Sequence, residues 1–282
     1  MTVTDSYISE LISVFSKTTS TNPSDIQFAN NYVTQQKQQN FPNFVHACTK
    51  ILANTNIEEV TRFQAGTQAK NCLTSKDENT LATLASKWEQ LGQQVKADIK
   101  NLILNTLGTE KRRPSSAAQL VAAIAYFELH KNQWEELLPS LAANVTKNEA
   151  SDIAMARQES SLEAIGYICA DIEQEHVVRF TSHVLTAIVH GMKTGATSHI
   201  KLAATNAMLN SLEFINTNFE QPSERNYIMQ VVCEASTDND TRIKVASLQC
   251  KVGQYSFSFE FLKFLTAVIF FHGLLFFYNP IS

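Results

Sequence analysis

Short stretches of this chain recur at nearly constant offsets, and this repetition limits the folds that the chain can adopt. Ala164 lies in Ser-Leu-Glu-Ala-Ile-Gly-Tyr-Ile, and a similar segment around Ala207 follows 43 residues later. The same offset relates Ile200-Lys201 to Ile243-Lys244. The segment Ala-Ile-Ala-Tyr at 123–126 is repeated in similar form 41 residues further on. A period of about 40 to 47 residues is typical of chains that stack pairs of helices.

The pattern of apolar residues is helical along most of the chain. Apolar residues recur every three or four positions, as on one helix face, beginning with Ile8, Leu11, Ile12 and Phe15. Glycine (8 residues) and proline (6) are scarce, and both interrupt helices. Start and stop signals predict further helices at about 23–38, 42–54, 57–74, from 75 onward, 92–107, 114–131, 132–146, 150–170, 177–194, 197–215, 222–236 and from 240. No strand is expected before residue 251.

The paired helices predict an all-α fold, a right-handed superhelical solenoid of HEAT repeats with about five complete repeats and a partial sixth. This solenoid is expected to comprise residues 1–250. Each repeat of such a stack contacts only its neighbours, and small residues such as Ala164 let the second helices of successive pairs approach. An irregular helical bundle is the alternative. Because a solenoid presents a long curved surface, we expect it to bind other proteins.

Charge and motifs exclude several other classes of protein. The net charge is −4 and the pI is about 6.0, so the basic surface of a nucleic-acid-binding protein is not expected. The five cysteines lack zinc or redox spacing, and the polar N-terminus has no secretory signal core. No nucleotide-binding loop, nucleophile elbow or zinc pair is present. We therefore predict no enzyme activity and no cofactor.

The histidines do not predict a metal site. His176, His183 and His190 are seven residues apart and are expected on one exposed helix face. At a rise of 1.5 Å per residue, successive members would lie about 10.5 Å apart, which is too far to hold one ion. Trp88 and Trp134 are expected in the core between helices.

Several longer strings resemble the importin-β family of transport receptors. The segment from Arg62 to Asp77, Arg-Phe-Gln-Ala-Gly-Thr-Gln-Ala-Lys-Asn-Cys-Leu-Thr-Ser-Lys-Asp, is similar to the amino-terminal signature of this family, and the signature region is assigned to 29–109. Further similar strings lie at 107–110, 113–117, 162–169, 201–207, 210–214 and 228–235. The resemblance extends from about residue 7 to residue 250.

This resemblance implies a receptor for nuclear protein import. Members of the family bind the GTP form of the GTPase Ran, nucleoporins with phenylalanine-glycine (FG) repeats, and cargo through the adaptor importin-α. The first two partners are expected for this chain, whereas the repeats that bind importin-α are expected to be absent. The cytoplasm, the nucleus and the nuclear pore are the expected locations. A general HEAT scaffold with another protein partner, such as a phosphatase scaffold subunit, is the alternative.

The resemblance also assigns a nucleoporin-binding groove. In the family, nucleoporin phenylalanines insert between the outer helices of the fifth and sixth repeats. The matching residues here are Leu185, Thr186 and Val189 on one helix and Glu224, Tyr227 and Ile228 on the other. Leu185 and Val189 are four residues apart and therefore share a helix face. The alternative is that these side chains only fill the space between repeats.

Ran is expected on the inner, second helices of the first four repeats. These helices correspond to about 23–38, 57–74, 114–131 and 150–170 in this chain. The candidate contacts in the signature region are Arg62, Lys70, Asn71 and Lys76. The alternative is that these four residues form only a solvent-exposed helix face and a buried helix cap, without a contact to Ran.

Residues 251–282 form a divergent tail, where the resemblance stops. The tail holds eight of the 17 phenylalanines, and Phe261–Tyr278 is strongly apolar. One interpretation is an unspliced intron, because Lys251-Val252 can be encoded by AAG-GTN. A second is a membrane anchor, although a helix of this length spans only about 27 Å and Lys263 would be costly inside a bilayer. A third is a cover for the open end of the solenoid.

Overall fold

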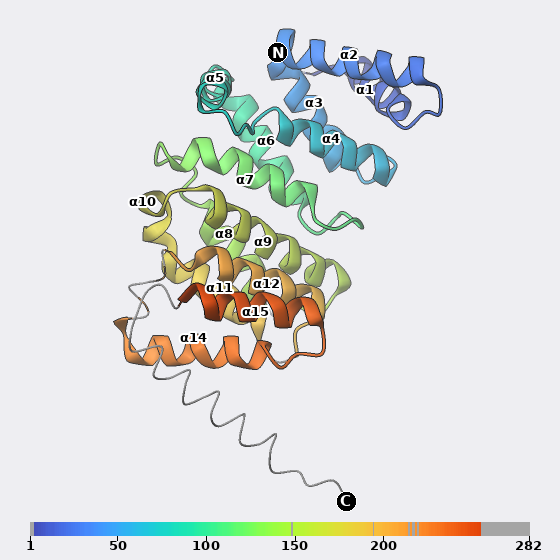
Figure 1. Ribbon diagram of the computed structural model, residues 1–282. Coiled ribbons are helices and arrows are strands. Elements are labelled where there is room, and N and C mark those ends of the chain that lie inside the picture. Colours follow the sequence, from blue (N-terminus) through green and yellow to red (C-terminus); the bar gives the residue numbers. More distant parts are fainter. Residues whose placement is uncertain are drawn as a thin grey trace, which may run out of the picture.

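The computed structural model describes residues 3–254 except 148, 194, 214, 216, 217 and 219. Every regular element within these residues is a helix, as predicted, and Figure 1 shows the helices stacked along one direction. No helix in this part of the chain has the length and apolar character needed to cross a bilayer. The apolar run Phe261–Tyr278 of the tail lies outside the described residues.

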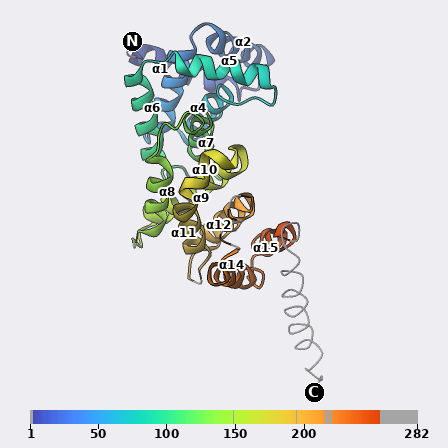
Figure 2. The same ribbon diagram turned by 90° about the vertical axis from the view of Figure 1, so that its left-hand side faces the viewer.

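Two layers of helices run along the stack. The first layer contains α1 (Asp5–Lys17), α3 (Phe41–Ala53), α6 (Gln93–Thr106), α8 (Leu137–Thr146), α11 (Thr181–Met192) and α14 (Pro222–Ala235). The second contains their partners α2 (Pro23–Gln39), α4 (Glu59–Asn71), α7 (Ser116–Leu129), α9 (Asp152–Asp171), α12 (Ser198–Ser211) and α15 (Thr241–Gln254). Two further helices, α5 (Glu78–Glu89) and α10 (Gln174–Val177), connect successive pairs. Figure 2 shows α6, α8 and α11 along one edge of the arch, with α7, α9 and α12 inside them.

Polar residues just before the helices determine where these helices begin. The side chains of Asn22, Asp77, Ser115 and Ser151 each accept a hydrogen bond from a backbone N–H in the first turn of α2, α5, α7 and α9, respectively. Such N-caps satisfy amide groups that have no partner within the helix. The helix starts predicted at about residues 23, 75 and 114 therefore lie close to the observed starts at Pro23, Glu78 and Ser116.

The helix predicted at 177–194 is not continuous. Helix α10 ends at Val177, and α11 begins only at Thr181 after a 3-10 turn. The chain changes direction at this turn, so His176 lies on a different helix from His183 and His190. The prediction that these three histidines share one exposed face is therefore wrong.

The closest approach between repeats occurs where the internal repetition places small residues. Gly166 of α9 faces Ala207 of α12, and a Cβ atom added to Gly166 would lie 3.2 Å from the Ala207 Cα. The side-chain amide of Asn210 donates a hydrogen bond across this interface to the Gly166 carbonyl oxygen, at 3.0 Å. The expected close packing of second helices is confirmed at this pair.

A buried carboxylate joins α5, α6 and α7. Glu128 of α7 is only 2% exposed. Trp88 Nε1 donates a hydrogen bond to one oxygen of Glu128 and Lys100 Nζ to the other, both at 2.8 Å. Trp88 and Trp134 are 1% and 5% exposed, so the prediction that both tryptophans lie in the core is confirmed.

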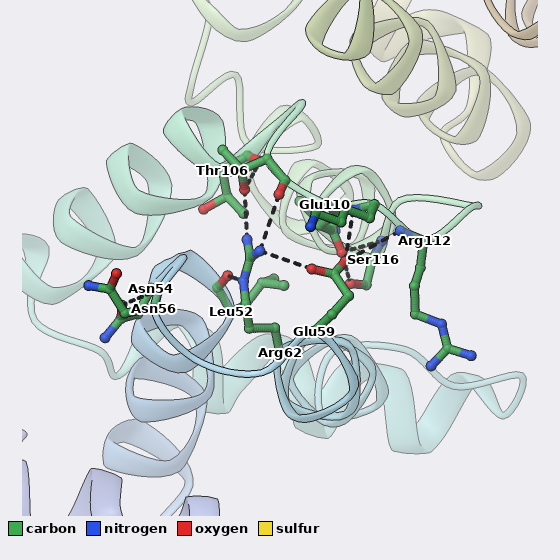
Figure 3. Close-up of polar contacts among 12 residues, drawn as sticks. Leu52, Asn54, Asn56, Glu59, Arg62, Thr106, Glu110, Arg112 and Ser116 are labelled. Carbon is green, nitrogen blue, oxygen red and sulfur yellow. Dashed lines mark hydrogen bonds and ion pairs between the residues drawn. The ribbon is translucent and has the colours of Figure 1, made fainter. Parts of the chain in front are cut away.

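Arg62 connects α4 with the end of α3 and with the loop after α6 (Figure 3). Its Nε donates a hydrogen bond to the carbonyl oxygen of Leu52 at 2.8 Å. Its terminal nitrogens reach the carbonyl oxygen of Thr109 at 3.1 Å and the Thr109 hydroxyl at 2.7 Å. Glu59 supplies a counter-charge 3.2 Å from Nη1. The planar guanidinium group can donate hydrogen bonds to all of these acceptors at once, whereas the compact ammonium group of a lysine cannot.

Glu110, in the same loop, caps the N-terminus of α7. Its carboxylate accepts hydrogen bonds from the N–H groups of Ser116 and Ala117 at 3.1 and 3.0 Å, and from the hydroxyl groups of Ser115 and Ser116. A negative charge at this end of a helix is stabilised by the helix dipole. Ser116 is thereby held against Gly66 of α4, where an added Cβ atom would lie 2.7 Å from the Ser116 Oγ.

Gly66→Ala should lower the free energy of unfolding by about 1–2 kcal/mol, because the new methyl group would overlap the Ser116 side chain that Glu110 holds in place. The higher helix propensity of alanine offsets only part of this loss. Urea unfolding of the full chain measures the change. Gly92→Ala is the matched control, since no atom lies within 4 Å of its added Cβ. Equal destabilisation by both substitutions would contradict the overlap.

Arg62→Lys should lower the free energy of unfolding by about 2–3 kcal/mol, because lysine leaves the buried carbonyl of Leu52 and the half-buried oxygens of Thr109 without a donor. Thermal unfolding followed by circular dichroism measures the effect. Arg112→Lys is the control, since Arg112 is exposed, and it should change stability by no more than about 0.5 kcal/mol. An Arg62→Lys protein as stable as the Arg112→Lys control would show that the contacts of Arg62 contribute little.

Candidate functional site

A groove of about 350 Å³ opens between α11 and α14. Its lining includes all six residues that were predicted for the nucleoporin site: Leu185, Thr186, Val189, Glu224, Tyr227 and Ile228. The remaining lining residues are Ser182, His190, Lys193 and Asn218, which the sequence analysis did not assign. The stacking of the fifth and sixth helix pairs thus brings together side chains from helices that α12 separates in the sequence.

The base of the groove is apolar. Val189 and Ile228 are 5% and 1% exposed, whereas Tyr227 is 48% exposed at the rim. Leu185 lies one helical turn before Val189 on the same face of α11. The Thr186 hydroxyl donates a hydrogen bond to a carbonyl oxygen one turn earlier in α11, at 2.7 Å, so its hydrogen-bonding need is met within the helix. The groove therefore offers aliphatic surface beside one aromatic ring.

The ionised groups of the groove lie on opposite walls. Burial and, to a lesser extent, Lys193 lower the pKa of His190, so this imidazole is neutral at physiological pH. Lys193 and Glu224 are the charged side chains among the described lining residues. Asn218 Nδ2 donates a hydrogen bond to the Glu224 carboxylate at 2.5 Å, which fixes one of these charges at the rim. An apolar ligand can thus enter between charges of opposite sign without burying either of them.

The size of the groove suits a single aromatic side chain of a flexible partner. Its volume is at the lower end of the range of about 300–1,000 Å³ found for small-molecule pockets. Complete burial of one phenylalanine side chain contributes about 1.5–3 kcal/mol. One such contact is weak and reversible, so firm attachment requires several of them.

A second cavity, of about 320 Å³, lies between α9, α12 and α15. On its polar side, Arg113 donates hydrogen bonds to both carboxylate oxygens of Glu159, at 2.6 and 2.8 Å. Burial raises the pKa of Glu163 to about 7, although this carboxylate accepts a hydrogen bond from the Ser115 N–H. No role was predicted for these residues, although Arg113 and Glu163 lie in strings that resemble the family.

The four residues predicted to contact Ran lie on α4 and just after it, but they differ in accessibility. Arg62 is 3% exposed and is engaged in the contacts of Figure 3, which leaves little of its side chain accessible to a partner. Lys70 is half-buried, and Asn71 and Lys76 are exposed. The signature string gave no signal that could separate a buried arginine from exposed lysines.

Parts of the sequence match known proteins. Residues 29–109 match the family model described as the importin-beta N-terminal domain. Importin subunit beta-1 of Schizosaccharomyces pombe is 39% identical to this chain over 214 residues, and importin subunit beta-1 of Saccharomyces cerevisiae is 36% identical over 229 residues. These alignments cover 75% and 79% of this chain but only 24% and 26% of the relatives. The chain therefore spans about a quarter of the length of these relatives.

Solved structures show the same architecture. Yeast importin-β, Kap95p, is 29% identical and superposes with a TM-score of 0.80, covering 91% of this chain and 30% of that chain. A Kap95:Nup1 complex gives a TM-score of 0.78 at 29% identity with the same coverage. A structure of Kap95p with RanGDP, in which Kap95p binding induces the switch loops of RanGDP to adopt the GTP-bound conformation, gives 0.81 at 30% identity. It covers 91% of this chain and 30% of that chain.

The sequence relatives and the solved structures indicate the same fold and the same family. The stacked helix pairs have the architecture of the importin-β HEAT solenoid, so the predicted fold class is confirmed. The relatives are transport receptors and not enzymes, in agreement with the lack of catalytic motifs. The chain therefore belongs to the importin-β family.

Proposed function

We propose that this chain belongs to a nuclear import receptor and that the groove between α11 and α14 binds phenylalanine side chains of FG nucleoporins. The observation that carries the proposal is the convergence of Leu185, Val189, Tyr227 and Ile228 on one apolar groove. A solved relative forms a complex with Nup1, which supports the same kind of partner for this chain. Movement between cytoplasm and nucleus through the nuclear pore is part of the proposal.

The free energy that one phenylalanine gains in the groove fits transient binding during transport better than permanent attachment to a nucleoporin. A phenylalanine in the groove gains the free energy of burying one ring, and Tyr227 supplies an aromatic edge or face for it. A nucleoporin with many such phenylalanines rebinds at high effective concentration, so avidity replaces the strength of a single contact. The receptor can then move along the partner, because each contact breaks easily.

Val189→Asp should weaken binding of an FG peptide to the full chain by at least about ten-fold, because a carboxylate at the base of the groove would lose its hydration when the ring enters. Fluorescence anisotropy with a labelled FG peptide measures the dissociation constant. Tyr227→Ala is the second variant, since Tyr227 is 48% exposed and its removal leaves the core intact. It should weaken binding in the same direction.

Two controls make this result specific. Val245→Asp places the same charge at an exposed valine of α15, where the side chain is 48% exposed, and should leave FG binding unchanged. A peptide with alanine in place of phenylalanine should not bind to the wild type. If the folded wild type, verified by circular dichroism, fails to bind the FG peptide, the chain is better described as a general HEAT scaffold.

Ran is the second proposed partner, with α2, α4, α7 and α9 as its contact surface. The structure of Kap95p with RanGDP supports this partner. At the end of α4, Lys70 is half-buried and Asn71 is exposed, and Lys76 is exposed in the loop that follows. Arg62 contributes only indirectly, because its contacts hold α4 in place. We expect the positive charges of these lysines to increase the rate of association with acidic groups on the GTPase.

Lys76→Glu should weaken binding of GTP-loaded Ran to the full chain by about five- to ten-fold at low salt, since charge reversal replaces attraction by repulsion. Surface plasmon resonance with Ran in its GTP and GDP forms measures both affinities. Lys147→Glu, at the end of α8 in the first layer, is the control and should have no effect. Equal effects of both substitutions would place Ran elsewhere on the chain.

A further inference from the structure

Three side chains with metal-binding groups meet at the end of α7, although the sequence analysis predicted no metal site. His130 is the C-cap residue of α7, and Glu173 and His176 belong to the start and body of α10. One potential ligand atom from each residue lies within 4.8 Å of those of the other two. Figures 1 and 2 both place α10 beside the end of α7, so the stacking of repeats creates this cluster.

The orientation of His130 is fixed by the backbone. Its Nδ1 lies 2.5 Å from the carbonyl oxygen of Tyr126, one helical turn earlier in α7. A carbonyl oxygen can only accept, so Nδ1 carries the hydrogen and Nε2 presents its lone pair. Metal-binding histidines usually have their second nitrogen held by a carbonyl or carboxylate in this way, which fixes the tautomer and raises the basicity of the ligand.

The second imidazole is held against the first. The ring centroids of His130 and His176 are 4.2 Å apart, with an angle of 41° between the planes. Tyr126 also contacts the His130 ring, at a centroid distance of 4.5 Å. The His176 side chain is 18% exposed and His130 is half-buried, so neither ring is free to move far from the other. Both rings can supply nitrogen ligands from a restricted position.

The carboxylate of Glu173 is not used elsewhere in the described part of the chain. Glu173 is the N-cap residue of α10, but its side chain accepts no capping hydrogen bond. It also takes part in no ion pair or side-chain hydrogen bond among the described residues. A second carboxylate, that of Glu175, lies 3.3 Å from His176 Nε2 and makes the surroundings more favourable for a cation.

We propose that His130, Glu173 and His176 bind a divalent cation of the zinc class. Two imidazole nitrogens and one carboxylate form a donor set that suits Zn²⁺, and three protein ligands leave a coordination position for water. With bonds of about 2.0–2.2 Å, tetrahedral ligand atoms are separated by about 3.3–3.6 Å. The ligand atoms already lie within 4.8 Å of one another, so small rotations of an exposed glutamate and two imidazole rings are enough to reach this spacing.

The bound ion would add a second polar link between two repeats that are joined here by side-chain packing and by the ion pair of Arg179 with Glu135, at 3.3 Å. Helix α10 has four residues and is followed directly by the 3-10 turn that leads into α11. An ion held by α7 and α10 fixes the start of this segment relative to the third helix pair. The site is independent of the nucleoporin proposal, because none of its three residues lines the groove between α11 and α14.

Zinc binding to the full chain tests the proposal directly. Competition with a chromogenic chelator, with Zn²⁺ as the only added metal, measures affinity and stoichiometry in the presence of a non-chelating reductant. The wild type should bind one equivalent, and His130→Gln, Glu173→Gln and His176→Gln should each bind at least about ten-fold more weakly. Co²⁺ in place of Zn²⁺ should give a visible absorption spectrum of low-symmetry nitrogen and oxygen coordination, which is lost in the same variants.

Two controls decide the outcome. His183→Gln removes an exposed histidine of α11 outside the cluster and should bind Zn²⁺ like the wild type. Cys233→Ser removes the half-exposed thiol, the other four cysteines being buried, and should also bind normally. Wild-type affinity in all three ligand variants, or a loss of binding in either control, would overturn the proposal. Circular dichroism of each variant shows that a loss of binding is not a loss of folding.

Discussion

From α4 onward, stacking of one second-layer helix on the next determines the geometry of the molecule. The contact of Gly166 with Ala207 shows how close this stacking is, since a single added Cβ atom would come within 3.2 Å of the neighbouring backbone. Helices α4, α7, α9, α12 and α15 form one continuous series of such contacts. Because each repeat touches only its neighbours, the position of every helix further along depends on the sum of these local contacts. The groove between α11 and α14 is therefore positioned by packing in the layer behind it.

Buried or half-buried charge supports this packing at three places in the second and third helix pairs. Arg62 joins α3, α4 and the loop after α6, Glu110 caps α7, and Glu128 joins α5, α6 and α7. Each group is surrounded by hydrogen-bond partners, which reduces the cost of removing it from water. All three lie in the first half of the described chain. The interface of α9 with α12, in contrast, contains the close approach of Gly166 to Ala207 and the hydrogen bond of the Asn210 amide.

Periodicity was sufficient to predict the fold because helix pairs repeat a local pattern. The apolar spacing gave the helices, and Asn22, Asp77 and Ser115 gave several of their starts. The break between α10 and α11 was missed, since its residues keep the apolar spacing of a helix while the chain turns. The groove residues were predicted from the family resemblance, and their meeting in one groove depends on tertiary stacking. The contact of His130 with His176 was not predictable, because spacing along one helix says nothing about residues from different repeats.

The two walls of the groove belong to neighbouring repeats and not to one rigid unit. Leu185 and Val189 belong to α11, whereas Tyr227 and Ile228 belong to α14. The width of the groove is therefore a measure of the local bend of the arch. In the proposed function, a ring held between these walls would act as a wedge that opposes closure of the angle between the two repeats. Occupancy of this small groove would then be coupled to the curvature of the stack, and strain applied at a distant repeat would change the affinity of the groove.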